Sequence, residues 1–145
     1  MIEDRHEPRP DETTYPPLLL ITADSQEIVT EREIEAAERF ERGEQVPHVL
    51  NFENPEDLRK LLTHRRLEVL RTIKADPPES IRRLALQLDR NPAEVASDVN
   101  LLEEYGIIYF VENGQAKAPV VPYDEVRIEV SMLRPNDREQ SSASA

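Results

Sequence analysis

Nine arginine and lysine side chains fall between positions 59 and 90, against four acidic ones, so this stretch carries a net charge of +5. The whole chain carries −12, so the remaining residues sum to −17. Guanidinium and ammonium groups neutralise phosphate oxygens, and a local basic cluster is the usual electrostatic sign of a nucleic-acid contact. The cluster therefore predicts contact with a polyanion such as DNA. Solvated surface charge, paired along helices, is the alternative interpretation.

Two sets of side chains are candidates for contacts with double-stranded DNA. The candidates for phosphate contacts are Arg65, Arg66, Arg82, Arg83, Arg90 and Lys117. Asparagine can pair with adenine and glutamate can accept from cytosine N4, so the candidates for base contacts are Asn91, Glu94, Ser97 and Asn100. Positions 92–105 hold no Arg, Lys or His, and Glu94, Asp98, Glu103 and Glu104 give them a charge of −4. This segment cannot anchor DNA alone, and a solvated helix face is the alternative for its polar residues.

No other residue pattern predicts chemistry. The chain has no cysteine and three histidines, which excludes disulfides and the common thiolate zinc sites. Its three glycines form no phosphate-binding loop, dinucleotide fingerprint or nucleophile elbow. Asp124 and Glu125 adjoin each other, but acid-base catalysis needs a pocket and a perturbed environment, so a turn is the simpler interpretation. We expect neither an enzyme nor a bound metal or cofactor.

Three helices are expected to position the candidate side chains. Thr63, Ser80 and Asn91 have the side chains that cap helix starts, and Pro92 suits the first position of the third helix. Apolar residues then recur at helical spacing, as Leu67, Leu70 and Ile73 in the first helix, Ile81, Leu84, Ala85 and Leu88 in the second, and Val95, Val99 and Leu102 in the third. Asp76-Pro77-Pro78 ends the first helix, Asp89-Arg90 forms a tight turn, and Gly106 ends the third.

A two-stranded hairpin is expected directly after these helices. The segment 107–111 is rich in β-branched and aromatic residues, Asn113-Gly114 is a strong hairpin-turn signal, and 115–121 returns as the partner strand. Three helices followed by such a wing are typical of a winged helix-turn-helix. We therefore predict an α+β fold with a winged helix-turn-helix domain over residues 63–133, in which 126–130 alternates as a further strand.

The N-terminal third of the sequence is expected to form a smaller unit of strands and helices. An apolar strand at 18–22, a helix starting from the capping-box sequence Thr30-Glu31-Arg32-Glu33 and ending near Gly43, and a strand at 47–52 give a strand-helix-strand extension. A short helix over 54–62 completes this extension and linker, which together cover residues 15–62. Polar, aperiodic tails at 1–14 and 134–145 are expected to be disordered. No apolar run is long enough for a membrane span, and the acidic start lacks a signal peptide's basic region, so we expect a cytoplasmic protein with no membrane contact.

The sequence also resembles a known family. The runs LLTHRRLEVLRTI, PESIRRLALQLDRNPAEVASDVNLLEEYGII and APVVPYDEVRIEV resemble the MarR-like winged-helix DNA-binding proteins that are abundant in halophilic archaea. The resemblance covers about half the chain, from Leu61 to Val130, and extends more weakly upstream through VLNFENPEDLRK. It implies a transcription regulator, or in some members an antitoxin, from an acidic halophilic cytoplasm. This sequence has small residues, Ala93, Ala96 and Ser97, where that family usually offers long polar or basic side chains.

Two functional hypotheses follow. The first is a DNA-binding transcriptional regulator that acts as a homodimer, because one winged helix reads only a few base pairs. The N-terminal unit and the strand near 126–133 are the expected dimer surfaces. The alternative is an antitoxin or a transcription adaptor, in which the winged helix binds a protein partner, either a toxin or a transcription factor, through its acidic third helix.

Overall fold

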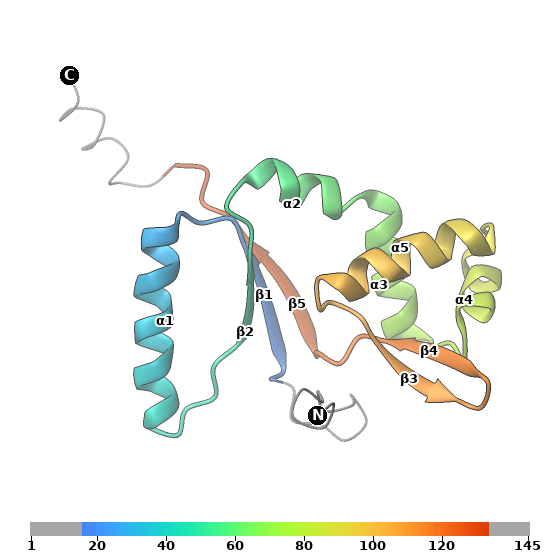
Figure 1. The fold of residues 1–145 in the computed structure, drawn as a ribbon, viewed down its shortest axis with the longest axis horizontal. Coiled ribbons are helices and arrows are strands. Elements are labelled where there is room, and N and C mark those ends of the chain that lie inside the picture. The colour runs from blue at the N-terminus through green and yellow to red at the C-terminus, as the bar shows by residue number, and fades with distance from the viewer. Residues whose placement is uncertain (1–15, 134–145) are drawn as a thin grey trace, which may run out of the picture.

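The computed structural model describes residues 16–133, and both predicted tails therefore lie outside the described residues. The described chain is α+β, with five helices, a three-stranded parallel sheet and an antiparallel hairpin (Figure 1). The elements in order are β1 (Leu18–Thr22), α1 (Gln26–Glu41), β2 (His48–Asn51), α2 (Pro55–Leu61), α3 (His64–Ala75), α4 (Ile81–Leu88), α5 (Pro92–Glu104), β3 (Tyr109–Asn113), β4 (Ala116–Val120) and β5 (Glu125–Glu129). No helix among residues 16–133 combines the length and apolar composition that crossing a membrane requires.

The parallel sheet joins the two ends of the described chain. Its strand order is β2-β1-β5, and the central Ile21 is level with Leu50 on one side and Ile128 on the other. The strand-helix-strand unit β1-α1-β2 is the one that the sequence predicts. The partner of β5 was not predicted, because residue alternation identifies a strand without revealing the distant segment to which it is hydrogen-bonded.

The two faces of the sheet are covered differently (Figure 1). Ile21, Val126 and Ile128 point toward α3, and with it they line one pocket. Thr22, Val49 and Asn51 point toward α1 on the opposite face. α1 buries no residue, whereas α3, α4 and α5 each bury apolar side chains against the sheet or one another. The helical region is therefore tightly packed and α1 is not.

The helix α1 begins earlier than the sequence predicts. It begins at Gln26 after Ser25, four residues before the capping box expected at Thr30. Thr30 lies inside the helix, where its hydroxyl donates a hydrogen bond to the Gln26 carbonyl at 3.0 Å. The capping-box pattern was wrong here because Thr30 has an upstream turn of helix-compatible residues, and its hydroxyl is satisfied by that turn.

The three helices α3, α4 and α5 begin at the residues expected from sequence. The side chains of Thr63, Ser80 and Asn91 each accept a hydrogen bond from a backbone N–H of the first turn. The turn between α4 and α5 passes through Asp89, whose φ of 54° is in the left-handed region that Asp tolerates better than most residues. Asn113 pairs with Ala116 in the hairpin, so its turn lies at Gly114-Gln115, one residue later than expected.

A single core connects the sheet to the helices. Tyr123, which is fully buried, donates from its hydroxyl to the Gly106 carbonyl at 3.1 Å, and the same oxygen lies 2.9 Å from His48 Nδ1 on β2. Phe52, just after β2, packs its ring against Tyr105 at a centroid distance of 5.4 Å. Because these contacts link β2 to the end of α5, the N-terminal unit and the helices share one hydrophobic core.

Candidate nucleic-acid interface

Five of the ten predicted site residues line one shallow groove of about 450 Å³ between the starts of α3 and α5. They are Arg65, Arg66, Arg90, Glu94 and Ser97, and the groove is completed by Thr63, His64 and Asp98. Thr63 caps α3 and Asn91 caps α5, so the N-terminal ends of both helices meet here. The structure therefore brings five of the ten candidates together, and their role in binding DNA stays a prediction.

Asp98 lines this groove and binds two arginines. Arg66 Nε is 3.1 Å from one carboxylate oxygen, and Arg90 Nη2 is 2.9 Å from the other. The side chains of Asp98, Arg66 and Arg90 are only 12%, 20% and 14% exposed. Because a charge removed from water must be paired, the three residues form a unit that ties α3, the α4–α5 turn and α5 together.

Arg66 has further partners inside the protein. Its Nη1 donates to the carbonyls of Lys60 and Leu61 at 2.9 and 3.1 Å. These carbonyls belong to the last turn of α2, where unpaired backbone oxygens and the helix dipole favour a cation. Arg66 therefore serves as a structural residue that fastens α2 to α5.

Arg65 and Glu94 form a weaker pair at the groove's edge. Arg65 Nη1 lies 3.3 Å from Glu94 Oε1, and the two side chains are 65% and 58% exposed. Exposed pairs contribute about 0–1 kcal/mol and exchange partners easily. Arg65 is thus accessible to an incoming anion in a way that Arg66 is not.

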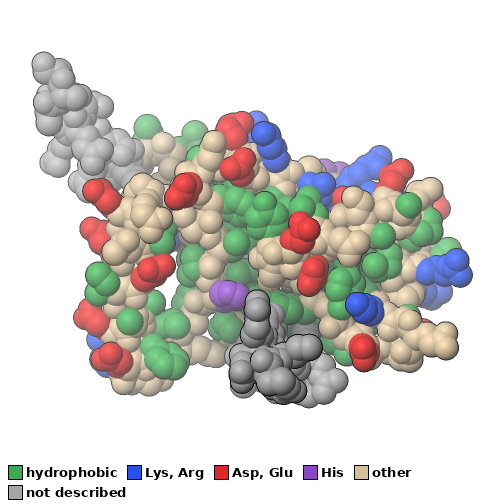
Figure 2. All heavy atoms as spheres, in the orientation of Figure 1, with side chains coloured by type: hydrophobic (Ala, Val, Ile, Leu, Met, Phe, Trp, Pro, Cys, Tyr) green, Lys and Arg blue, Asp and Glu red, His purple; other side chains and the backbone are tan. Residues whose placement is uncertain are grey.

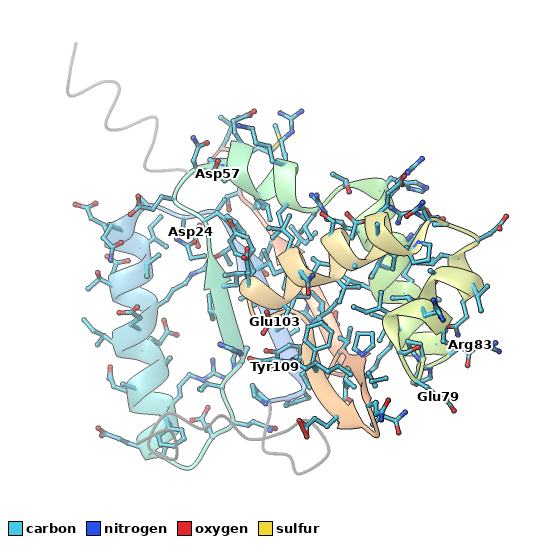
Figure 3. All side chains as sticks on the ribbon, turned by 45° about the vertical axis from the view of Figure 1, so that its right-hand side comes forward. Asp24, Asp57, Glu79, Arg83, Glu103 and Tyr109 are labelled. Atoms are coloured by element: carbon cyan, nitrogen blue, oxygen red, sulfur yellow. The ribbon has the colours of Figure 1, made fainter. Side chains whose placement is uncertain are left out.

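Three predicted cations lie outside the groove and have no ion-pair partner among residues 16–133. Arg82 and Arg83 on α4 and Lys117 on β4 are exposed, and no carboxylate in residues 16–133 lies within ion-pair distance of them. Figure 3 shows Arg83 projecting outward from α4. Asn113 Nδ2 donates to the Glu79 carbonyl at 3.3 Å, which brings the hairpin turn against the start of α4. The exposed cations of α4 and of the hairpin thus belong to neighbouring elements.

The exposed face of α5 is polar but not basic. Ser97 and Asn100 are exposed, whereas Asn91 uses its side-chain oxygen to accept from Ala93 N at 2.8 Å. Glu103 and Glu104 are exposed at the far end of the helix. Figure 2 shows acidic side chains spread over α1 at the left and most of the visible basic ones over the helices at the right. On the face drawn in Figure 2, acidic side chains therefore occur on both sides, whereas basic ones gather mainly at the right.

The role of Asp98 was missed, although the sequence contained a signal for it. It had been counted with the other acidic residues of the third helix as unbalanced charge, and its burial with two arginines corrects that count. Val95, Val99 and Leu102 define the buried stripe of α5, and position 98 falls on the same stripe at i+3 from Val95. An acidic residue on a buried stripe predicts an internal cation partner.

Residues 61–128 match the model of the protein family HVO_A0114. The matched segment is just under half of the chain, and it extends from the last residue of α2 into β5, so it contains α3, α4, α5, the hairpin and the groove. No curated protein and no solved structure matches the chain. The match coincides with the region in which the sequence resembles MarR-like proteins, and that finer resemblance stays a prediction.

Proposed function

We propose that this protein is a DNA-binding transcriptional regulator in which α3, α4, α5 and the β3–β4 hairpin act as a winged helix-turn-helix. The observation that carries the proposal is the set of exposed, unpaired cations Arg82, Arg83 and Lys117 on adjoining elements. Such cations release counterions when they meet phosphates, which provides most non-specific affinity for DNA. The helical order and the hairpin, which the sequence anticipated, support the same proposal.

In this proposal α5 enters the major groove, with α4 and the hairpin on the flanking backbone. The positive end of the α5 helix dipole lies at its N-terminal end and favours a nearby phosphate. Ser97 and Asn100 are the exposed polar side chains available to base edges. Asp98 and its two arginines hold α5 in place, so α5 can be presented rigidly although it carries no basic residue.

In this proposal two copies of the chain bind DNA together as a dimer, because one winged helix contacts only a few base pairs. On α1, Ile34 and Phe40 remain 59% and 70% exposed, so the N-terminal unit offers apolar surface for pairing. Light scattering of the full chain gives the test. A monomeric mass at the concentrations where DNA binds would contradict the dimer.

The test of DNA binding compares the duplex upstream of the protein's own gene with a random duplex of equal length, over a series of potassium concentrations. Replacing Arg82 and Arg83 together by Ala should weaken binding by about tenfold or more and reduce the salt slope by about two units, one for each lost phosphate contact. The control replaces Arg39 on α1 and Arg42, which directly follows α1, by Ala. This removes the same charge away from α4 and the hairpin, and light scattering checks that the control variant keeps the mass of the unaltered protein. Equal weakening by both double variants, or no binding of either duplex, would overturn the proposal.

A protein-interaction module is the second candidate, favoured by the absence of Arg, Lys and His from positions 92–105. In that case the acidic end of α5 would meet a basic partner. Replacing Glu103 and Glu104 by Gln distinguishes the candidates. A DNA reader should bind duplex DNA more tightly once this repulsion is removed, whereas a protein-interaction module should bind no duplex in either form.

A further inference from the structure

A pocket of about 350 Å³ lies between α3 and the face of the sheet formed by β1 and β5. Its lining is mostly aliphatic, with Ile21 and Ile128 from the sheet and Leu67 and Leu70 from α3. Small-molecule sites are typically apolar concavities of about 300–1,000 Å³ with a few polar groups. The pocket has the size and the apolar lining of such a site.

The pocket exists because α3 and the outer strand of the sheet are not in contact along their whole length. Leu70 is 9% exposed and belongs to the core, but Leu67, one turn earlier, is only half-buried. Across the pocket Ile128 keeps 48% of its surface exposed. Apolar surface left in water is unfavourable, so a molecule that covers it gains free energy in proportion to the area covered.

Two cations lie among these apolar side chains. Arg71 and Lys74 line the pocket from α3, three residues apart on one face of the helix. Lys74 Nζ donates to the carbonyls of Tyr123 and Val121 at 2.6 and 3.5 Å, which holds the ammonium beside the pocket. Neither cation has a carboxylate within ion-pair distance among residues 16–133, and Asp124 is the one acidic residue there that lines the pocket.

We propose that this pocket binds a small molecule with an apolar ring or chain and a single carboxylate. The aliphatic side chains would cover the apolar part, while Arg71 and Lys74 would bind the carboxylate through charge-assisted hydrogen bonds. Arg71 has a planar fork of donors, none of which is used by another described residue, so it is suited to a bidentate contact. The proposed site is separate from the DNA-facing cations and does not depend on DNA binding.

The test titrates the full chain into naphthalene-2-carboxylate and, separately, into its neutral analogue naphthalene-2-methanol. The protein contains no tryptophan, so naphthalene fluorescence anisotropy can be followed without tryptophan emission. Buffers use one potassium concentration at which circular dichroism shows the folded chain. The carboxylate should bind about tenfold more tightly than the alcohol, because hydrogen bonds to charged groups are worth more than neutral ones.

Variants then assign the binding to this pocket. Arg71→Gln should remove most of the carboxylate's advantage and leave the affinity of the alcohol unchanged, whereas Arg82→Gln, an equal loss of charge on α4, should change neither. Ile128→Gln should weaken both probes, and Arg127→Gln, on the opposite face of β5, should weaken neither. Equal affinity for the two probes, no binding of either at millimolar concentration, or equal effects of Arg71→Gln and Arg82→Gln would overturn the proposal.

Discussion

Arg66 and Arg90 differ from Arg82 and Arg83 in almost everything except residue type. The first two share the carboxylate of Asp98, and 20% and 14% of their side chains remain exposed. The second two are exposed on α4 with no ion pair among residues 16–133. All four belong to the same basic stretch, between positions 59 and 90, and the sequence predicts that all four contact phosphate.

This difference separates two uses of an arginine. A guanidinium removed from water needs a permanent partner, so the paired arginines stabilise the arrangement of α3 and α5 and are not free to bind phosphate. An exposed guanidinium contributes little to stability but can exchange its counterions for a polyanion. Substitutions that disrupt the buried group of Asp98, Arg66 and Arg90 should therefore change stability. Substitutions of the exposed cations on α4 and the hairpin should change DNA affinity, and four experiments test that division.

The largest effect is expected for Asp98→Ala, which leaves two partly buried arginines without their shared carboxylate. We expect the free energy of unfolding to fall by about 3 kcal/mol, measured by urea denaturation at fixed potassium concentration. The matched variant Glu94→Ala removes a 58% exposed carboxylate from the same helix, which lies 3.3 Å from Arg65 and 3.8 Å from Arg90. Because these contacts are solvated, the variant should cost less than about 1 kcal/mol. Equal losses for the two variants would show that Asp98 has no special structural role.

Arg66→Ala should have the next largest effect on stability, at about 2 kcal/mol, because Asp98 keeps one arginine while the end of α2 loses its cation. Arg82→Ala, the same substitution on α4, should change the free energy of unfolding by less than about 0.5 kcal/mol. The midpoints of urea denaturation of the two variants provide the measurement. A larger loss for Arg82→Ala would reverse the proposed division.

Lys117→Gln should affect DNA binding without affecting stability. Removal of one phosphate contact should lower the slope of log affinity against log potassium concentration by about one unit. Glu112 lies opposite Lys117 in the register of the hairpin, although their side chains form no ion pair. Glu112→Gln should therefore strengthen DNA binding, since it removes a negative charge beside the cation. If both variants weaken binding, the hairpin does not contact phosphate through Lys117.

The smallest effect is expected for Arg65→Gln, which breaks the exposed pair with Glu94. We expect a change in the free energy of unfolding below about 0.5 kcal/mol, because the pair is well solvated. The charge-preserving variant Arg65→Lys is the control, and urea midpoints compare the two. A loss that approaches that of Arg66→Ala would place Arg65 with the structural arginines.

Much of the fold could be predicted from sequence because the signals are local. Helix starts at Thr63, Ser80 and Asn91 depend on a side chain and an N–H two or three residues away. The hairpin follows from a turn sequence between two strands, and Gly114 supplies the positive φ of 67° that the turn needs. Helical periodicity also places the candidate residues Arg65, Glu94 and Ser97 on exposed faces, as the structure has them, but their meeting in one groove could not be predicted.

The tertiary structure alone decided which charges neutralise one another and where β5 belongs. Arg66 and Asp98 are 32 positions apart, and only the packing of α3 against α5 brings their side chains to 3.1 Å. β5 pairs with β1 across more than 100 residues, a contact that strand alternation cannot specify. Local patterns fix the faces of helices and strands, whereas burial and pairing depend on elements that meet only when the whole chain has folded.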